Sequence, residues 1–491
     1  MSALSKKPIA LSIADTENPE HQLNRVMGPG RLTLFGVGVI VGTGIFVLTG
    51  VAAAEKAGPA APLSFVVAAI ACGLAALCYA EFASSVPVAG SAYTYSYTSL
   101  GELFAWIIGW DLILEFAFGA ATVAKGWSGY FTTLMDDIGV TLPSSIAGTE
   151  ADFNVPAVLI VAFVAWVLIR GIQESSRLNV LVTIVKLSVI ALVIGLGIAY
   201  IDVDNWKPFI PDGQSGTAAT GLDETPLIQE ILGQPTSAFG VPGIFFGASL
   251  VFFAFIGFDI VATTAEETKN PQRDLPIGIF ASLVICTILY VLVSLVVTGM
   301  VPYTKLGVDA PLAFAFQENG VTWASTLISV GALAGLTSTV LILMYGQTRV
   351  FFAMARDRLL PPAFAHVHER YRTPYRITFV TAIAVALLAA LLPLKVLGEA
   401  TNIGTLFAFV LVSIAVIVLR RTDPDLPRAF RTPLVPLVPI LSVLACLWLM
   451  LNLPVGTWLR LVVWMAIGFV VYVLYARKHS RVAGDPAADG R

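Results

Sequence analysis

The sequence predicts an all-α integral membrane protein with twelve transmembrane helices, arranged as two inverted repeats of five helices followed by two extra C-terminal helices. Three observations predict this fold. Of the 491 residues, 57% are hydrophobic and only 12% are charged, and the mean hydropathy is +0.83. A chain of this composition has the lipid bilayer as the solvent for most of its length. Basic residues gather in alternate connections, and two apolar segments are interrupted by glycine at matching places.

Twelve segments are apolar and long enough to cross a bilayer. A hydrocarbon core of about 30 Å needs roughly 20 apolar residues per helix. The third segment is long, so we expect it to be tilted or to extend beyond the bilayer, and the fourth is short. The expected spans are residues 32–54, 60–87, 101–133, 155–170, 178–200, 242–265, 275–301, 321–348, 377–393, 401–419, 434–452 and 457–476.

The first and sixth spans are broken. The first contains Gly42-Thr43-Gly44-Ile45-Phe46, and the segment 241–265 contains Phe252 to Asp259 with Gly257 between them. A break within hydrocarbon leaves backbone polar groups unpaired, which is tolerated only where it lines a cavity or is buried in protein. Two breaks five spans apart define two halves of five helices, and an odd number of helices gives these halves opposite orientations. This pattern is typical of a secondary transporter with its site at the breaks.

The spans divide the chain into six parts. We expect the connection between the repeats to be acidic and to form either a vestibule that attracts cations or simply a solvated loop. The parts are an N-terminal segment 1–30, a first repeat 31–200, an external loop 201–241, a second repeat 242–420, the two extra helices within 434–476, and a C-terminal tail 477–491.

The placement of basic residues predicts the orientation of the chain. With the N-terminus in the cytoplasm, cytoplasmic segments contain 22 of the 29 Lys and Arg residues, and external segments contain five. The positive-inside rule therefore places both termini in the cytoplasm. Residues 1–30 have no apolar h-region, so we expect no cleaved signal peptide.

The two breaks suggest a clamp for a zwitterion. At Gly42–Ile45 a half-helix begins, and its first amides have no partner within the helix and a positive dipole end, which suits a carboxylate. At Phe253–Ile256 a half-helix ends, and its free carbonyls suit an ammonium group. The alternative for the first break is a packing face of small residues, Gly38-x-x-x-Gly42. The phenylalanines beside the second break either cap a pocket or pack in the core.

Ionisable groups within the membrane are further candidates, because each is costly there. Lys186 lies in an apolar stretch of the fifth span and is expected either to carry a proton or to form a structural ion pair or snorkel. Glu115 and Asp111 are four residues apart on one face of the third span. Glu115 is expected to line the pocket, carry a proton or pair with Lys125, with a structural role equally open, and Lys125 is expected to pair or to snorkel.

Other charged residues favour structural roles. We expect Asp111, Glu81 and Asp259 to form structural hydrogen bonds. Near the cytoplasmic end of the sixth span, a group of charges predicts either a network that closes an inner gate or a solvated loop. These charges are Glu266, Glu267, Lys269 and Arg273.

Several function classes are excluded by the sequence. The four cysteines, Cys72, Cys78, Cys286 and Cys446, all lie in apolar spans and are typical of core residues, not of a disulfide or metal site. There is no G-x-x-x-x-G-K-[ST] phosphate loop. We find no nucleophile–base or metal-ligand pattern, so we expect no enzyme activity, no cofactor, no metal and no nucleic acid partner.

Four strings resemble a known family. They are GVGVIVGTGIFVLTG at 36–50, CYAEFASSVPVAGSAYTYSY at 78–97, FFAFIGFD at 252–259 and AEETKNPQRDLP at 265–276. They look like the amino acid–polyamine–organocation superfamily, and most like bacterial relatives of the cationic amino acid transporter family. The resemblance implies the leucine-transporter-like fold of five plus five inverted helices. It implies that backbone groups bind the substrate carboxylate at Thr43, Gly44 and Ile45, and its ammonium at Phe253, Ala254 and Ile256, with Ile40 nearby.

The resemblance also implies roles for side chains. Lys186 falls where proton-coupled members place a lysine, against the place where sodium-coupled relatives hold an ion between the first and eighth spans. Thr337 and Ser338 are the expected hydroxyl neighbours of Lys186. Leu336 on the eighth span is expected to narrow the side-chain pocket, and Glu115 would suit a guanidinium group without being established as a specificity residue.

We therefore expect a proton-coupled symporter of L-amino acids in the plasma membrane, with small neutral substrates favoured slightly over cationic ones. A length of twelve spans suits a bacterial inner membrane. The expected partners are the amino acid, the proton and the lipid bilayer, and the sequence leaves open an accessory subunit. The alternatives are an amino acid exchanger and a non-transporting amino acid receptor of the same fold.

Overall fold

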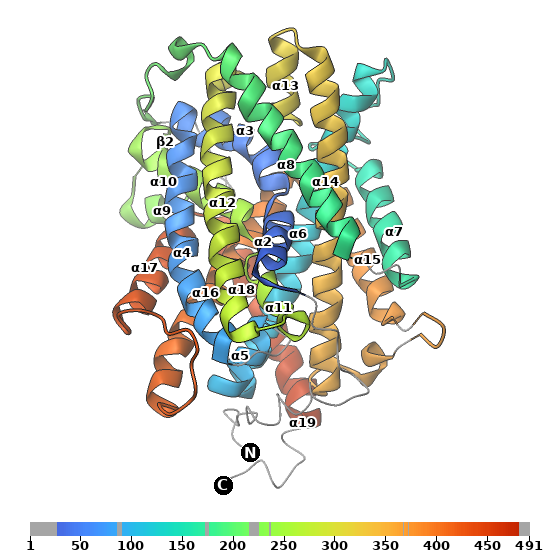
Figure 1. Ribbon diagram of the computed structural model, residues 1–491, viewed down its shortest axis with the longest axis vertical. Coiled ribbons are helices and arrows are strands. Elements are labelled where there is room, and N and C mark those ends of the chain that lie inside the picture. Colours follow the sequence, from blue (N-terminus) through green and yellow to red (C-terminus); the bar gives the residue numbers. More distant parts are fainter. Residues whose placement is uncertain are drawn as a thin grey trace.

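The computed structural model describes residues 27–85, 91–171, 176–215, 225–234, 237–366, 368–371 and 373–480. These residues form a bundle of helices that run roughly along one long axis (Figure 1). Eight helices of this part are long and apolar enough to cross a membrane, and four further apolar helices are shorter. The prediction of an all-α membrane protein is confirmed, and each of the twelve expected spans is helical in the part described.

The first five spans are helices with one interruption. The first span is α2 (Pro29–Ile40), then a π-helical segment (Gly44–Leu48), α3 (Thr49–Ala52) and a second π-helical segment (Ala53–Ala57). The remaining helices of this half are α4 (Ala61–Ser85), α5 (Ser91–Ser99), α6 (Glu102–Asp137), α7 (Val155–Ile169) and α8 (Ser176–Gly197). Of these, α5 lies between two spans and is polar and rich in tyrosine. The hydropathy pattern does not predict this helix.

The second half repeats this plan. The sixth span is α10 (Gly240–Val251), a 3₁₀ turn (Phe252–Phe255) and α11 (Ile260–Thr263). The following helices are α12 (Pro271–Met300), α13 (Pro311–Glu318), α14 (Thr322–Arg356), α15 (Tyr375–Leu391), α16 (Leu394–Thr422), α17 (Leu437–Leu451), α18 (Val455–Val471) and α19 (Arg477–His479). Several of these helices begin earlier or end later than the apolar stretches, because a helix continues into the interfacial layers where polar residues are tolerated.

The contacts between helices are unchanged in kind when each helix of one half is replaced by the equivalent helix of the other half. Contacts of α2 with α12 are matched by contacts of α10 with α4, and contacts of α6 with α16 are matched by those of α14 with α8. Three pairs map onto themselves: α4 with α12, α6 with α14, and α7 with α15. This is the contact pattern expected when spans 1–5 and spans 6–10 are equivalent by a two-fold operation.

The two ends of the bundle are called here the α13 end and the α19 end, after the helices that lie there (Figure 1). At the α13 end, the connection between the repeats contains α9 (Leu227–Leu232) and a hairpin of β1 (Gln214–Ser215) with β2 (Ser237–Ala238). Its backbone is bonded to two distant places: Leu227 N donates to Leu453 O at 3.0 Å, and Phe239 N donates to Lys56 O at 2.9 Å. Residues 216–224 and 235–236 of the predicted acidic loop lie outside the described residues, as do 1–26 and 481–491 of the two terminal segments.

Candidate functional site

The two breaks contact each other at the middle of the bundle. A Cβ added to Gly44 would lie 2.3 Å from both Cα and Cβ of Ala254, so only glycine permits this crossing. On the other segment, Ile256 is extended and Gly257 has a φ of +116°, which glycine adopts without strain. The glycines of both breaks therefore permit a close approach of backbone to backbone, and the predicted binding segments lie side by side.

Three consecutive amides are open at the first break. In the described residues, no backbone carbonyl accepts from the amides of Gly42, Thr43 or Gly44. The amide of Ile45, which we expected to bind a carboxylate, donates to Gly42 O at 3.2 Å, and that of Phe46 does so at 3.3 Å. The row of open amides therefore begins one residue earlier than expected. The Thr43 hydroxyl is buried without a hydrogen-bond partner in this part of the chain, and its side chain packs against Gly126 of α6.

The carbonyls expected to bind an ammonium group are partly occupied by a tyrosine. The hydroxyl of Tyr290, on α12, lies 2.8 Å from Ile40 O and 2.8 Å from Ala254 O. A hydroxyl has one proton to donate, so at any moment one of these two carbonyls lacks it. Phe253 O accepts from Ile256 N at 3.2 Å, which leaves its second lone pair. Hydropathy alone gives no signal for Tyr290, because it is one tyrosine in an apolar helix.

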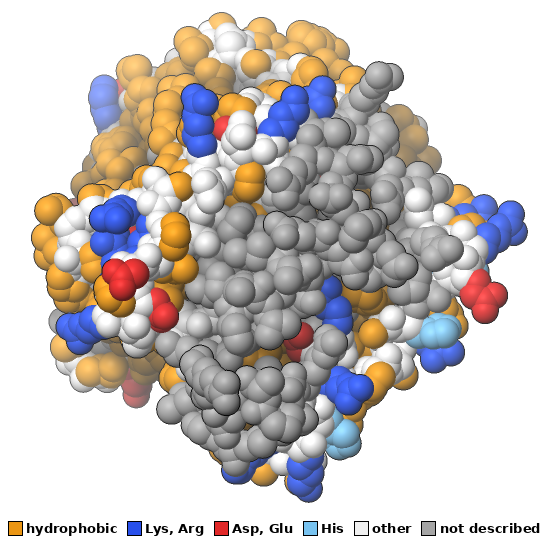
Figure 2. Space-filling view, turned by 60° about the horizontal axis from the view of Figure 1, so that its bottom comes forward, with side chains coloured by type: hydrophobic (Ala, Val, Ile, Leu, Met, Phe, Trp, Pro, Cys, Tyr) orange, Lys and Arg blue, Asp and Glu red, His pale blue; other side chains and the backbone are white. Residues whose placement is uncertain are grey.

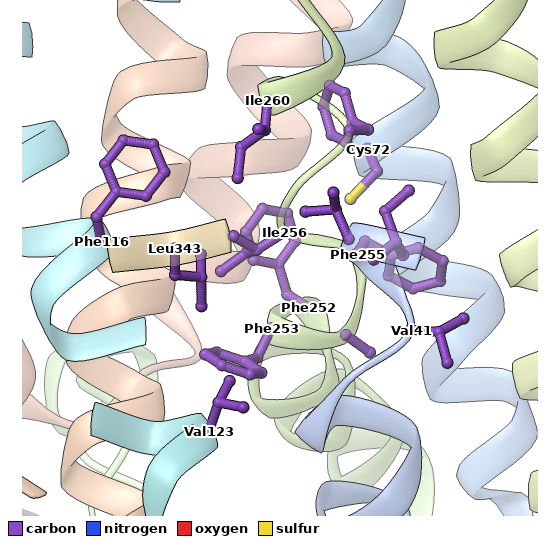
Figure 3. Packing of buried hydrophobic residues seen from close by; sticks show 14 of the residues in the cluster. Val41, Cys72, Phe116, Val123, Phe252, Phe253, Phe255, Ile256, Ile260 and Leu343 are labelled. Atoms are coloured by element: carbon purple, nitrogen blue, oxygen red, sulfur yellow. The ribbon is translucent and has the colours of Figure 1, made fainter. Parts of the chain in front are cut away.

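Apolar side chains surround the second break. Figure 3 shows Phe253 and Ile256 on one side of the picture's centre facing Leu343 of α14 and Phe116 of α6, with Val123 of α6 next to Phe253. All of them are buried. Leu336, the residue expected to narrow the pocket, is also buried and lies seven residues before Leu343, hence on the same face of α14. The side chain of any molecule bound between the breaks would therefore contact these apolar residues.

Lys186 fastens α8 to the first broken span. Its Nζ atom donates to Gly38 O at 2.6 Å, to Val41 O at 3.0 Å and to Thr339 Oγ1 at 2.9 Å. Val41 directly follows α2, so its carbonyl is one that the break releases from the helix. The lysine side chain is fully buried and passes over Gly335 of α14.

The hydroxyl group that accepts a hydrogen bond from Lys186 belongs to Thr339. This corrects our expectation of Thr337 and Ser338. Thr337 faces elsewhere: it donates to Leu333 O at 2.8 Å and accepts from Trp127 Nε1 at 3.0 Å. The hydroxyl of Ser338 has no partner in the described residues. The error is one of helical phase. Gly335 and Thr339 are four residues apart, and this small-residue column is the face of α14 that meets α8.

A second buried polar group lies near the breaks. Glu115 is within electrostatic range of Asp111 and Asp259. Neither oxygen of Asp111 has a hydrogen-bond partner in the described residues, and Oε1 of Glu115 has none there either. The structural hydrogen bonds expected for Asp111 are therefore not found in this part of the chain. The described residues contain no group of His, Cys, Asp and Glu side chains that would hold a metal ion.

Comparison with known proteins decides the family. The family model described as amino acid permease matches residues 28–475. The chain belongs to the amino acid permease family. It is 48% identical over 489 residues to the branched-chain amino acid permease BcaP of Bacillus subtilis, covering 98% of this chain and 99% of that protein. It is 45% identical over 484 residues to the methylthioribose transporter of the same organism, with 98% and 99% covered.

A third relative of this permease is cationic amino acid transporter 2, vacuolar, of Arabidopsis thaliana. It is 39% identical over 417 residues, which cover 84% of this chain and 62% of that protein. The resemblance to a bacterial relative of the cationic amino acid transporters is thereby confirmed. The expectation that the chain is not an enzyme is confirmed as well, because the family and these relatives are transporters.

At the α13 end, the permease closes over the breaks. The Tyr130 hydroxyl of α6 donates to Phe46 O at 2.8 Å, and Leu306 and Pro311 pack on Gly50 of the first span. Lys125 is 1% exposed and lies within electrostatic range of Glu150 and Asp309, and no ion pair of Lys125 with Glu115 is found in the part of the chain that the structure describes. Burial raises the pKa of Glu150, although Lys125 opposes this shift.

At the α19 end, the charges after the sixth span are partly paired. Glu267 lies 3.6 Å from Arg349 of α14, and its backbone carbonyl accepts from Met27 N at 3.0 Å. The expected network thus includes Glu267, whereas Arg273 is exposed and Glu266 has no described side chain. Glu81 has the structural role expected of it, since Arg420 donates to both of its oxygens at 2.7 and 2.9 Å.

Proposed function

We propose that this permease moves L-amino acids with neutral, aliphatic side chains across the plasma membrane, coupled to protons. The observation that carries the proposal is the crossing of the two breaks, which places open amides of Gly42–Gly44 beside carbonyls that Tyr290 only half satisfies. Open amides bind a carboxylate and open carbonyls bind an ammonium group. This pair of sites fits the head group shared by all α-amino acids.

The wall beside the head group supports the choice of side chain. Phe253, Ile256 and Leu343 offer no hydrogen bond, so a guanidinium or ammonium end placed among them would lose its hydration without compensation. An aliphatic side chain gains about 25 cal/mol for each Å² of apolar surface buried there. The name of the relative BcaP, a branched-chain amino acid permease, agrees with this choice. Cationic amino acids are the second candidate, because Glu115 lies in the same region.

Lys186 is the proposed proton carrier. Its hydrogen-bond partners in the described residues include the carbonyl of Val41, next to the open amides, so the charge of the lysine and the position of the first break are linked. When Nζ loses its proton, it keeps two N–H donors for the acceptors Gly38 O, Val41 O and Thr339 Oγ1, so at least one of these contacts is weakened. We propose that protonation of Lys186 from outside stabilises the first break in the conformation that binds substrate. Release of this proton to the inside then accompanies release of the substrate.

The orientation is part of the proposal. The α19 end faces the cytoplasm, because most Lys and Arg of the connections are at that end and the positive-inside rule then holds. The α13 end, closed by Leu306 and Pro311, faces the outside. Alternating access would then require these contacts on Gly50 to separate, while the Glu267–Arg349 contact at the other end stays closed.

The test is uptake by purified permease in liposomes. Labelled leucine, alanine, arginine, lysine and methylthioribose are supplied with and without an inward proton gradient. We expect leucine or alanine to accumulate with the gradient, and Lys186→Met to abolish accumulation while Lys207→Met, an exposed lysine of the outer connection, leaves it intact. Uptake only into liposomes preloaded with amino acid would establish exchange instead. Uptake of methylthioribose alone would overturn the zwitterion clamp, and binding without uptake would indicate a receptor.

A further inference from the structure

The helices α7 and α15 form a paired ridge on the outside of the bundle, at its right-hand edge in Figure 1. Their outer faces are strongly apolar. On α7, Leu159 is 63% exposed and Phe163 is 53% exposed, and on α15 Phe379 is 59% exposed. In a membrane protein, such side chains contact acyl chains and not water. The ridge is therefore a lipid-facing surface lined by exposed aromatic and aliphatic side chains.

Arginines lie where this apolar surface ends. Arg170 directly follows α7, and its guanidinium carbon lies 4.7 Å from the ring centre of the exposed Trp166. Arg376 lies in the first turn of α15, with its guanidinium carbon 5.7 Å from the ring of Tyr375. Both arginines are exposed. A guanidinium over an aromatic ring is held at the level of the lipid head groups, where tryptophan and tyrosine are favoured.

A short connection brings a third arginine to the same place. Arg370 is exposed and lies over Tyr371, at 5.5 Å from its ring centre. The connection is folded: Nδ1 of His368 accepts from the amides of Arg370 and Tyr371 at 3.1 and 3.3 Å. It is also fixed to α7, because the Thr373 hydroxyl donates to Ile169 O at 2.8 Å.

Among the described residues, the charge of this cluster is unbalanced. Its described members are Arg170, Arg370 and Arg376, and the one carboxylate among the described residues of 368–376 is Glu369, which is exposed. Figure 2 looks onto the α19 end and shows His side chains beside Lys and Arg side chains at one edge of the molecule. The cluster therefore presents several guanidinium donors to one place at the rim of the bundle.

We propose that this cluster binds the phosphate of an anionic phospholipid in the cytoplasmic leaflet, with the acyl chains along the α7–α15 ridge. Arginine recognises phosphate with two parallel N–H donors, which an anionic head group accepts without a competing positive charge. Basic pockets between helices on the cytoplasmic side are the usual sites for such lipids. The proposal rests on the orientation given under Proposed function, and it does not depend on the substrate or on proton coupling.

Binding is measured without transport, so a failure here leaves the proposed function untouched. Purified full-length permease in neutral detergent is titrated with phosphatidylglycerol, and bound lipid is counted by native mass spectrometry while thermal unfolding is followed in parallel. We expect Arg170→Gln and Arg376→Gln each to weaken binding about fivefold, at about 1 kcal/mol per arginine near the head groups. The matched control is Arg273→Gln, an exposed arginine at the same end of the bundle, which should bind as the unaltered protein does.

Three results would overturn the proposal. Equal binding of phosphatidylcholine would show that the negative charge is not recognised. Equal thermal stabilisation by inorganic phosphate would show a small-anion site and no lipid site. Unchanged phosphatidylglycerol binding in the double variant Arg170→Gln/Arg376→Gln, with its folding confirmed by an unchanged melting temperature in phosphatidylcholine, would place the lipid elsewhere.

Discussion

The Nζ atom of Lys186 and the carbonyl oxygen of Gly38 are 2.6 Å apart, although the two residues lie on the fifth and first spans. This contact fixes α8 against the half-helix that ends at the first break. A charged donor to a backbone carbonyl is among the stronger hydrogen bonds in proteins. Changes around this contact are therefore expected to affect the first break before they affect the rest of the fold.

Replacing Thr339 by valine tests the corrected partner of Lys186. The change keeps the shape of the side chain and removes the hydroxyl 2.9 Å from Nζ, at a cost of about 1.5–3 kcal/mol for a hydrogen bond to a charged group. We expect the pH dependence of leucine uptake to shift, together with a modest fall in melting temperature from the lost hydrogen bond. Ser338→Ala is the control, since that hydroxyl has no partner in the described residues. An effect of Ser338→Ala as large as that of Thr339→Val would contradict the correction.

Tyr290→Phe removes the hydroxyl shared by Ile40 O and Ala254 O. The hydroxyl bridges one carbonyl from each break and holds both in position for the ammonium group, so its loss costs roughly 1–1.5 kcal/mol, or about five- to tenfold in substrate affinity. Equilibrium binding of leucine by calorimetry measures this loss. Tyr303→Phe, in the connection between α12 and α13, should bind leucine normally. Unchanged affinity in Tyr290→Phe would separate the tyrosine from the substrate site.

Gly44→Ala should separate the two breaks. The new Cβ would meet Ala254 at 2.3 Å, and backbone must move to admit it, with a strain of about 1–3 kcal/mol. We expect a lower melting temperature and no measurable leucine binding. Gly195→Ala, in α8 with no atom within 4 Å of the added Cβ, should melt at or above the temperature of the unaltered protein. Normal binding in Gly44→Ala would rule out the crossing as the binding site.

Leu343→Ala should change selectivity. The change opens space beside Phe253 and Ile256 that a larger substrate side chain can fill. Uptake of phenylalanine relative to alanine should therefore rise several-fold. Leu159→Ala on the lipid-facing side of α7 is the control and should keep the original ratio. If the ratio is unchanged in Leu343→Ala, this leucine does not line the side-chain subsite.

Removing the charge of Glu81 should destabilise the permease without touching the substrate site. Glu81→Gln leaves Arg420 without its bidentate partner and lowers the free energy of unfolding by about 3 kcal/mol. Thermal unfolding in detergent measures the loss. Asp204→Asn breaks the exposed pair with Lys207 and should have almost no effect.

The sequence alone is sufficient to predict the spans, their order and the location of the breaks. These follow from hydropathy and from glycine within apolar segments, which are local properties. Lys186 was found for the same reason, because a charge in an apolar helix is visible without any knowledge of its neighbours.

The partners in the site were not predictable in this way. The selection of Thr339 over Thr337 and Ser338 depends on the rotation of α14 about its axis, and three adjacent residues differ there by about 100° each. Tyr290 and Leu343 belong to the site only because α12 and α14 pack beside the breaks. The engaged amide of Ile45 depends on how the backbone turns after Gly42, which residue type alone does not determine.

The backbone of the connection between the repeats is bonded both to the end of the first span at the α13 end and to the α17–α18 corner. Besides the bonds of Leu227 and Phe239, Val455 N donates to Thr225 O at 3.0 Å. The two C-terminal helices, which lie outside the two halves, are thus bonded to a segment that, in the proposed cycle, moves when the α13 end opens. An antibody fragment that clamps this connection would act as a non-competitive inhibitor, slowing turnover at saturating substrate while leaving the affinity for substrate intact.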